Sequence, residues 1–183
     1  MIQVHLLGSA HLRSGDMPIA GPPTQRHRLA LLALLADSWP LPLSRERALA
    51  LLWPEKDTPS ARRLLNLAVH VLRSALGESC IQSSSSGLLL QPTSLVCDLL
   101  TLQTALRAKD AEAVVQAWHG PLLDGFSLDE SVEFGYWLDE RRQSLQAGYV
   151  QALRAMVERQ GDDVHARIAT CRKLIAVDPH AAS

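Results

Sequence analysis

The chain has 183 residues, of which 47% are hydrophobic and 20% charged, and its formal net charge is −1. This apolar content suffices for a packed core, which excludes an intrinsically disordered chain. No run approaches the roughly 18 consecutive apolar residues of a membrane span, and we expect no signal peptide at the N-terminus. Three widely spaced cysteines argue against a disulfide framework. We therefore expect a cytoplasmic protein.

Charge is distributed unevenly along the chain. Residues 1–97 hold nine Lys and Arg against six Asp and Glu, whereas residues 98–183 hold nine against thirteen. The small positive excess therefore lies in the N-terminal part, where it would suit a phosphate-bearing partner. The hydrophobic pattern also changes near this point, so we expect two domains, 1–97 and 98–183.

The N-terminal part begins with short pieces that alternate apolar and polar side chains around a turn signal at 14–16, which predicts a small antiparallel meander. Three helices are predicted next, at 25–36, 44–53 and 60–76. Thr24 and Ser44 are the expected N-caps of the first two helices. Pro54 ends the second helix because proline cannot continue it, and Gly77 ends the third.

A predicted hairpin at about 80–91 follows, because two short apolar pieces flank a serine-rich tip. Beyond it the pattern turns helical, which predicts helices at 98–107, 110–118, about 130–159, and 163–177. Breaks at Gly161-Asp162 and Asp178-Pro179 have the spacing of a helical repeat. We expect this repeat array to be truncated.

The third predicted helix carries the most informative pattern. Five side chains able to donate hydrogen bonds share one arc of about 100°, namely Arg62, Arg63, Asn66, His70 and Arg73. From a helix in the major groove, arginine reads guanine edges, asparagine reads adenine edges, and all of these residues can hold phosphate. The alternative is an ordinary amphipathic helix with a basic solvated face.

Three helices followed by a hairpin are typical of a winged helix, a helix-turn-helix with a β wing. Arg26 and Arg45 stand near the starts of the first two helices, where positive side chains suit phosphate. Gln82 and Ser84 lie toward the wing tip and are candidate contacts to the DNA backbone. Each of these residues has a plainer interpretation as part of a solvated surface or loop.

A family resemblance rests on several runs in this order. The runs ALLWPE at 50–55, SARR at 60–63 and LRSALG at 72–77 resemble the OmpR-like winged helix of SARP-type bacterial regulators. The run AWHGPLLDGF at 117–126, with EFGYWL at 133–138, resembles the bacterial transcriptional activator domain of the same regulators. The two resemblances together span nearly the whole chain.

This resemblance implies a mainly α protein with small antiparallel β elements: a winged helix-turn-helix followed by tetratricopeptide-like helical hairpins. It implies transcriptional regulation, with the helix at about 60–76 in the major groove of double-stranded DNA and the wing at about 80–91. The alternative is a protein-interaction or scaffold module whose winged helix no longer binds DNA.

The acidic C-terminal part is predicted to bind protein. Its last hairpin is expected to expose apolar surface from Ile168, Leu174 and Ile175. The simplest partner for such a surface is a second copy of the chain, which would also supply two DNA-binding half-sites.

Enzymatic motifs are missing from the sequence. The seven histidines are scattered, and no HExxH, paired CxxC, GxSxG, GxxxxGK[ST] or GxGxxG occurs. Cys80 and Cys97 flank the predicted hairpin and are interpreted as small buried hydrophobes. We expect no catalysis, no cofactor and no metal.

Overall fold

The computed structural model describes residues 1–159 and 163–177, so the predicted breaks at Gly161-Asp162 and Asp178-Pro179 lie outside the described residues. The described residues form six strands: β1 (Ile2–His5), β2 (His11–Ser14), β3 (Met17–Ile19), β4 (Ile81–Ser84), β5 (Gly87–Leu90) and β6 (Leu95–Cys97). The helices are a 3-10 turn η1 (Pro22–Thr24), α1 (Arg26–Ser38), α2 (Arg45–Leu52), α3 (Thr58–Leu76), α4 (Asp98–Ala108), α5 (Ala111–Ala117), α6 (Val132–Arg159) and α7 (Val164–Val177).

The N-terminal meander forms as predicted and gains a fourth strand. β1, β2 and β3 pair antiparallel in sequence order. β6 then pairs in parallel with the free side of β1, with Ile2 opposite Leu95 and Val4 opposite Cys97. The sequence pattern did not predict this strand, because a parallel partner more than ninety residues away leaves no local turn signal.

The helix-turn-helix consists of α1, α2 and α3, and its predicted caps are partly correct. The Ser44 side chain accepts a hydrogen bond from the Arg47 N–H and caps α2. Thr24 is not the cap of α1, because it lies in η1 and its hydroxyl donates to the Gly21 carbonyl. α3 begins before the expected position because Asp57 caps it by accepting from the Ser60 N–H.

The wing is the β4–β5 hairpin, with Ile81 opposite Leu90. Leu43, between α1 and α2, forms two backbone hydrogen bonds with Leu88 and so ties the wing to the helices. Gly87 is required at the start of β5, because a Cβ there would lie 2.2 Å from the Leu43 carbonyl oxygen. The wing is therefore a fixed part of the helix-turn-helix.

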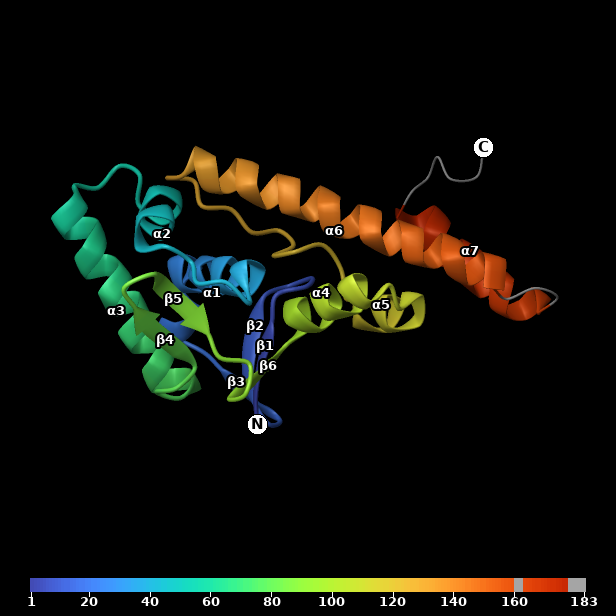
Figure 1. Ribbon diagram of the computed structural model, residues 1–183, viewed down its shortest axis with the longest axis horizontal. Helices are drawn as coiled ribbons and strands as arrows, with labels where there is room; N and C mark the ends of the chain where they lie inside the picture. The colour runs from blue at the N-terminus through green and yellow to red at the C-terminus, as the bar shows by residue number, and fades with distance from the viewer. Residues whose placement is uncertain (160–162, 178–183) are drawn as a thin grey trace.

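The C-terminal part is a series of packed helices, α4 to α7. Figure 1 shows α3 and the wing at one end of the molecule, α7 toward the other, and the long α6 running between them. Aromatic side chains pack against one another in this part: Trp118 stacks on Tyr149, and Phe134 contacts both Phe126 and Trp137. The predicted fold class, a winged helix-turn-helix followed by a helical repeat, is confirmed.

Candidate nucleic-acid interface

The outer face of α3 presents four of the five DNA-contacting residues predicted on this helix. Arg62, Arg63, Asn66 and His70 are all exposed. The opposite face is buried in the core through Ala61, Leu65, Ala68, Val69, Leu72 and Leu76. Because helical periodicity separates these two faces, burying the apolar one fixes the direction in which the basic one points.

Arg73 has a different role from its neighbours on α3. Its Nε and Nη2 donate to the Ile81 carbonyl at 2.9 and 2.6 Å, and Nη2 also donates to the Ser83 hydroxyl at 3.0 Å. Both acceptors lie on β4. Arg73 is half-buried and joins the C-terminal half of α3 to the wing, so it fixes the position of the wing beside the helix.

Asn66, in the middle of α3, is held by the second helix. The Arg45 Nη1 donates to the Asn66 Oδ1 at 3.0 Å. This bond leaves the Asn66 amide NH2, which is a donor, pointing away from the arginine. Arg45 and Asn66, two of the predicted DNA contacts, therefore lie together on the surface formed by the exposed face of α3.

Arg26, at the start of α1, points to the C-terminal part of the chain. Its Nη1 donates to the Ser127 carbonyl at 3.2 Å and lies 3.9 Å from the Asp129 carboxylate. The side chain remains largely exposed. The structure thus does not bring Arg26 into the cluster around Asn66, and its nearest charged partner is acidic.

The two predicted wing residues lie on the exposed side of the hairpin. The Gln82 Oε1 accepts from the Gln91 amide at 2.8 Å. The Ser84 hydroxyl lies 2.7 Å from the Ser86 hydroxyl and forms part of the tip. Both side chains retain exposed polar atoms able to contact a backbone.

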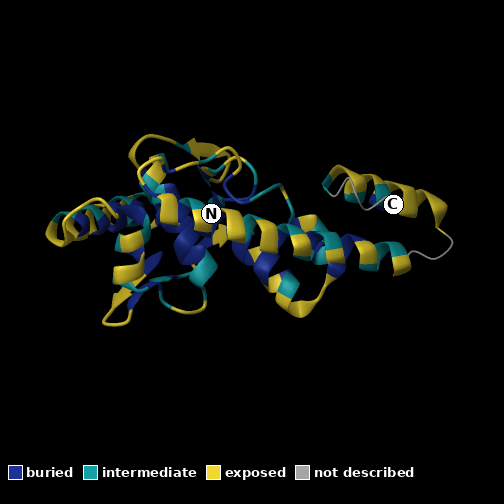
Figure 2. Cartoon of the chain, turned by 90° about the horizontal axis from the view of Figure 1, so that it is seen from above, coloured by how far each residue is buried: buried dark blue, intermediate teal, exposed yellow. Residues whose placement is uncertain are grey.

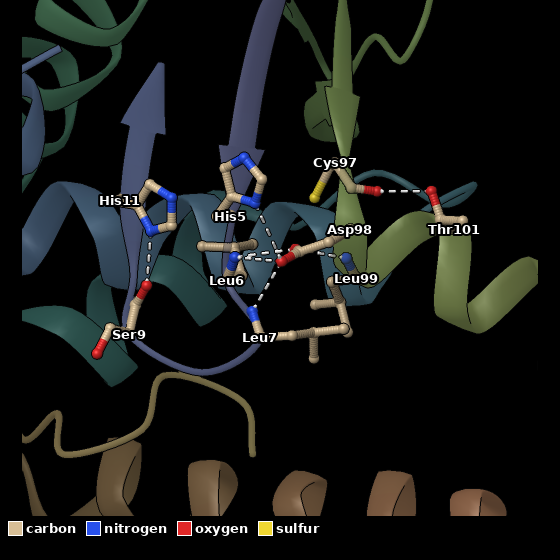
Figure 3. A network of polar contacts seen from close by, with 9 residues as sticks. All are labelled: His5, Leu6, Leu7, Ser9, His11, Cys97, Asp98, Leu99 and Thr101. Atoms are coloured by element: carbon tan, nitrogen blue, oxygen red, sulfur yellow. Dashed lines mark hydrogen bonds and ion pairs between the residues drawn. The ribbon is translucent and has the colours of Figure 1, made fainter. Parts of the chain in front are cut away.

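A junction that the sequence pattern did not reveal connects the N-terminal sheet to α4. The Asp98 carboxylate accepts from the N–H groups of Leu6, Leu7 and Leu99 at 2.7–3.0 Å (Figure 3). Burial raises the pKa of Asp98 above its ordinary value, although these three hydrogen bonds oppose the rise. One carboxylate therefore links the segment directly after β1 to the first helix of the C-terminal part.

His5 borders the same junction. Its Nδ1 lies 3.9 Å from the Asp98 carboxylate, and its ring stacks on His11 with centroids 4.3 Å apart (Figure 3). Burial, followed by the nearby His11, lowers the pKa of His5 below its ordinary value of 6.5. The surroundings of His5 therefore favour the neutral ring.

Further contacts of the junction attach the helical repeat to the winged helix. The Asp37 Oδ1, at the end of α1, accepts from Arg141 Nε at 2.8 Å and from Gln103 Nε2 at 3.1 Å. The Ser131 hydroxyl donates to the Leu51 carbonyl of α2 at 2.7 Å and accepts from the first turn of α6. These bonds hold α1, α2, α4 and α6 in one arrangement.

The cysteines at the hairpin and the sheet are buried, as expected. Burial raises the pKa of Cys80 to about 11 and that of Cys97 to about 12. Such thiols stay protonated at neutral pH and are poor nucleophiles. Within residues 1–159 and 163–177, no cluster of three His, Cys, Asp or Glu side chains has the arrangement of a metal site.

The apolar surface predicted on the last hairpin is present in part. Ile168 and Ile175 on α7 are about half exposed, together with Val164, whereas Leu174 packs against the core. Figure 2 shows α7 as a largely exposed helix. Among the described helices, none is both long and apolar enough to cross a membrane.

Comparisons with known proteins bear on the fold. No family model and no curated protein matches the sequence. A solved structure described as Mycobacterium tuberculosis EmbR in complex with a low-affinity phosphopeptide is similar, with a TM-score of 0.57 and 20% sequence identity. The match covers 96% of this chain and 54% of the other, so the chain spans about half the length of that structure. The chain thus shares its fold with that part of EmbR.

Proposed function

We propose that the chain is a transcriptional regulator of the SARP type, which binds double-stranded DNA with α3 in the major groove and the β4–β5 wing against the backbone. The DNA-binding part comprises residues 1–97, and the helical repeat from residue 98 binds protein. No catalysis is assigned.

One observation carries this proposal: α3 presents an exposed basic face and is fixed beside a wing. Arg62 and Arg63 supply two exposed positive charges, and Arg73 orients the hairpin next to them. A helix-turn-helix needs such an arrangement, because its recognition helix must enter the groove while other contacts fix the protein on the phosphates. Similarity in fold to EmbR agrees with this interpretation.

Binding to a duplex of random sequence tests the proposal. We expect the full chain to bind fluorescein-labelled duplex DNA, with affinity that falls as salt rises because counterions are released. The double variant Arg62→Ala/Arg63→Ala removes two phosphate contacts. It should reduce the slope of log affinity against log salt by about 2, as measured by fluorescence anisotropy.

A matched control removes the same charge elsewhere. Arg172 and Lys173 are also adjacent, exposed and on a helix, α7. Arg172→Ala/Lys173→Ala should leave the salt slope unchanged. Equal losses in the two double variants would attribute binding to net charge alone, and no binding by the unsubstituted chain would refute the proposed function.

The scaffold interpretation is supported by a specific observation. Three of the predicted DNA-contacting arginines, Arg26, Arg45 and Arg73, donate hydrogen bonds within the chain. These internal contacts occupy N–H donors that would otherwise be available for phosphate. Failure to bind DNA by a chain that remains folded would favour this second function.

The protein-binding role of the helical repeat rests on α7. Val164, Ile168 and Ile175 expose apolar surface there, and the EmbR structure of similar fold is described as a peptide complex. A homodimer is the simplest form of this proposal. Sedimentation velocity of the full chain and of the Ile168→Glu variant tests the homodimer. A dimer formed through α7 should dissociate in the variant. A full chain that is monomeric would refute the homodimer.

A further inference from the structure

Leu67 is an exposed apolar side chain at the border of the polar outer face of α3. Half of its surface is exposed. One helical turn to either side, Arg63 and His70 are exposed as well, and its neighbour in sequence is Asn66. Leu67 therefore lies at the edge of the polar face, next to the half-buried Leu64 and Val71.

Packing does not explain this leucine. The partly buried apolar residues that pack against the core include Leu64 and Ala75 of the same helix but not Leu67. The core contacts of α3 come from its opposite face. The exposed half of Leu67 thus gains no stability from burial in the core.

Base pairs in the major groove display one apolar group that a leucine can contact. This group is the methyl at C5 of thymine, and apolar side chains are the usual readers of it. The adjacent Asn66 keeps its amide donor available for a base edge, because its oxygen accepts from Arg45. Asn66 and Leu67 follow each other on α3 with side chains about 100° apart around the helix axis, so a polar and an apolar candidate reader border the same exposed surface.

We propose that Leu67 is a specificity-determining residue that contacts the C5 methyl group of a thymine in the DNA site. This inference rests on the proposed function, because it requires α3 to lie in the major groove. It assigns a sequence preference to a residue that carries neither charge nor hydrogen-bonding group.

Thymine and deoxyuridine differ only in this methyl group, which allows a direct test. Sites are first selected from a random duplex library with the full chain, and each thymine of the preferred site is then replaced singly by deoxyuridine. We expect one replacement to weaken binding about fourfold, the factor for burying one methyl group. For Leu67→Ala the same replacement should change binding by less than about 1.5-fold, since the methyl contact is already lost.

A second variant and a second modified base serve as controls for the methyl contact. Leu67→Met keeps an apolar side chain of similar volume and should retain the deoxyuridine penalty. At the same position, 5-methylcytosine should bind better than cytosine, because it restores the methyl group without the other groups of thymine. Circular dichroism should show that both variants fold as the unsubstituted chain does.

The outcomes separate this inference from the proposed function. If the chain selects a site but every deoxyuridine replacement affects Leu67→Ala and the unsubstituted chain equally, Leu67 reads no methyl group while DNA binding stands. If the library yields no enriched sequence because the chain binds no DNA, both the function and the inference are wrong.

Discussion

The outer face of α3 and the junction between the two parts of the chain use polar side chains in opposite ways. On α3, Arg62, Arg63 and His70 are exposed and point away from the core. At the junction, Asp98 and Asp37 are largely buried and accept several hydrogen bonds each. The α3 face is therefore available for an external partner, whereas the junction groups are already paired.

Because of this difference, we expect residues of the α3 face to affect DNA binding and residues of the junction to affect folding stability. Substitutions on the α3 face should change DNA affinity with little effect on folding, because exposed polar residues contribute little to stability. Substitutions in the core and the junction should do the reverse. Four single substitutions, at Trp53, Asp98, Asn66 and His5, test this separation.

Trp53→Ala should produce the largest loss of stability. Trp53 is buried at the end of α2 and stacks on His27 with centroids 5.3 Å apart. Removing it leaves a cavity, which should lower the free energy of unfolding by about 3–5 kcal/mol, as measured by urea denaturation. An unchanged midpoint would show that this residue contributes nothing to the core.

Asp98→Ala should destabilise the chain by about 3 kcal/mol, because buried N–H groups at Leu6 and Leu7 lose their acceptor. Asp98→Asn is the matched control, since its amide oxygen still accepts hydrogen bonds and its cost should be smaller. DNA affinity of the folded fraction should be unaffected by either change. Equal denaturation midpoints for Asp98→Ala and the unsubstituted chain would contradict the role assigned to the carboxylate.

Asn66→Ala should act on binding alone. Loss of a base-reading amide is expected to weaken binding at the preferred site by roughly 1–3 kcal/mol and to blur the preference at one base pair. Its unfolding free energy should stay within about 0.5 kcal/mol of the unsubstituted value, as for other exposed positions. Evenly reduced binding across all sites would show that Asn66 does not read a base.

His5→Gln should flatten the pH dependence of stability slightly. The pKa of His5 is lowered on folding from 6.5, so the unfolded chain binds the proton more tightly. The stability this group contributes is complete above pH 6.5 and is lost as the pH falls through its folded pKa. Denaturation curves between pH 7.5 and about 5 should show a smaller loss in the variant, and parallel losses would mean that His5 does not titrate differently in the folded state.

The helices and the hairpin were predictable because their signals are local. Ser44, which caps α2, and Pro54, which follows its end, both lie close to the helix in sequence. The serine-rich tip likewise lies directly between the two wing strands. The exposed face of α3 followed from helical periodicity, which needs no knowledge of the rest of the chain. The cap at Thr24 was wrong because the adjacent prolines form a separate 3-10 turn.

The partners of individual side chains were not predictable in this way. Arg73 and Asn66 occupy the same arc of α3, yet Arg73 binds the wing and Asn66 binds Arg45. Sequence periodicity gives the direction of a side chain from its helix but not what another element places there. For the candidate site, sequence periodicity therefore identified the exposed face of α3 but not the role of each residue on it.

The sequence alone determined the order of the α-helices and of the strands other than β6, the apolar faces that form the core and the basic outer face of α3. Each of these follows from residues within one helical turn or one hairpin. The tertiary structure decided the rest. β6 joins β1, Asp98 accepts from Leu6 across 92 positions, and Arg141 reaches Asp37 across 104. Such contacts form only after the elements have packed, and no local pattern encodes which distant group a given charge will meet.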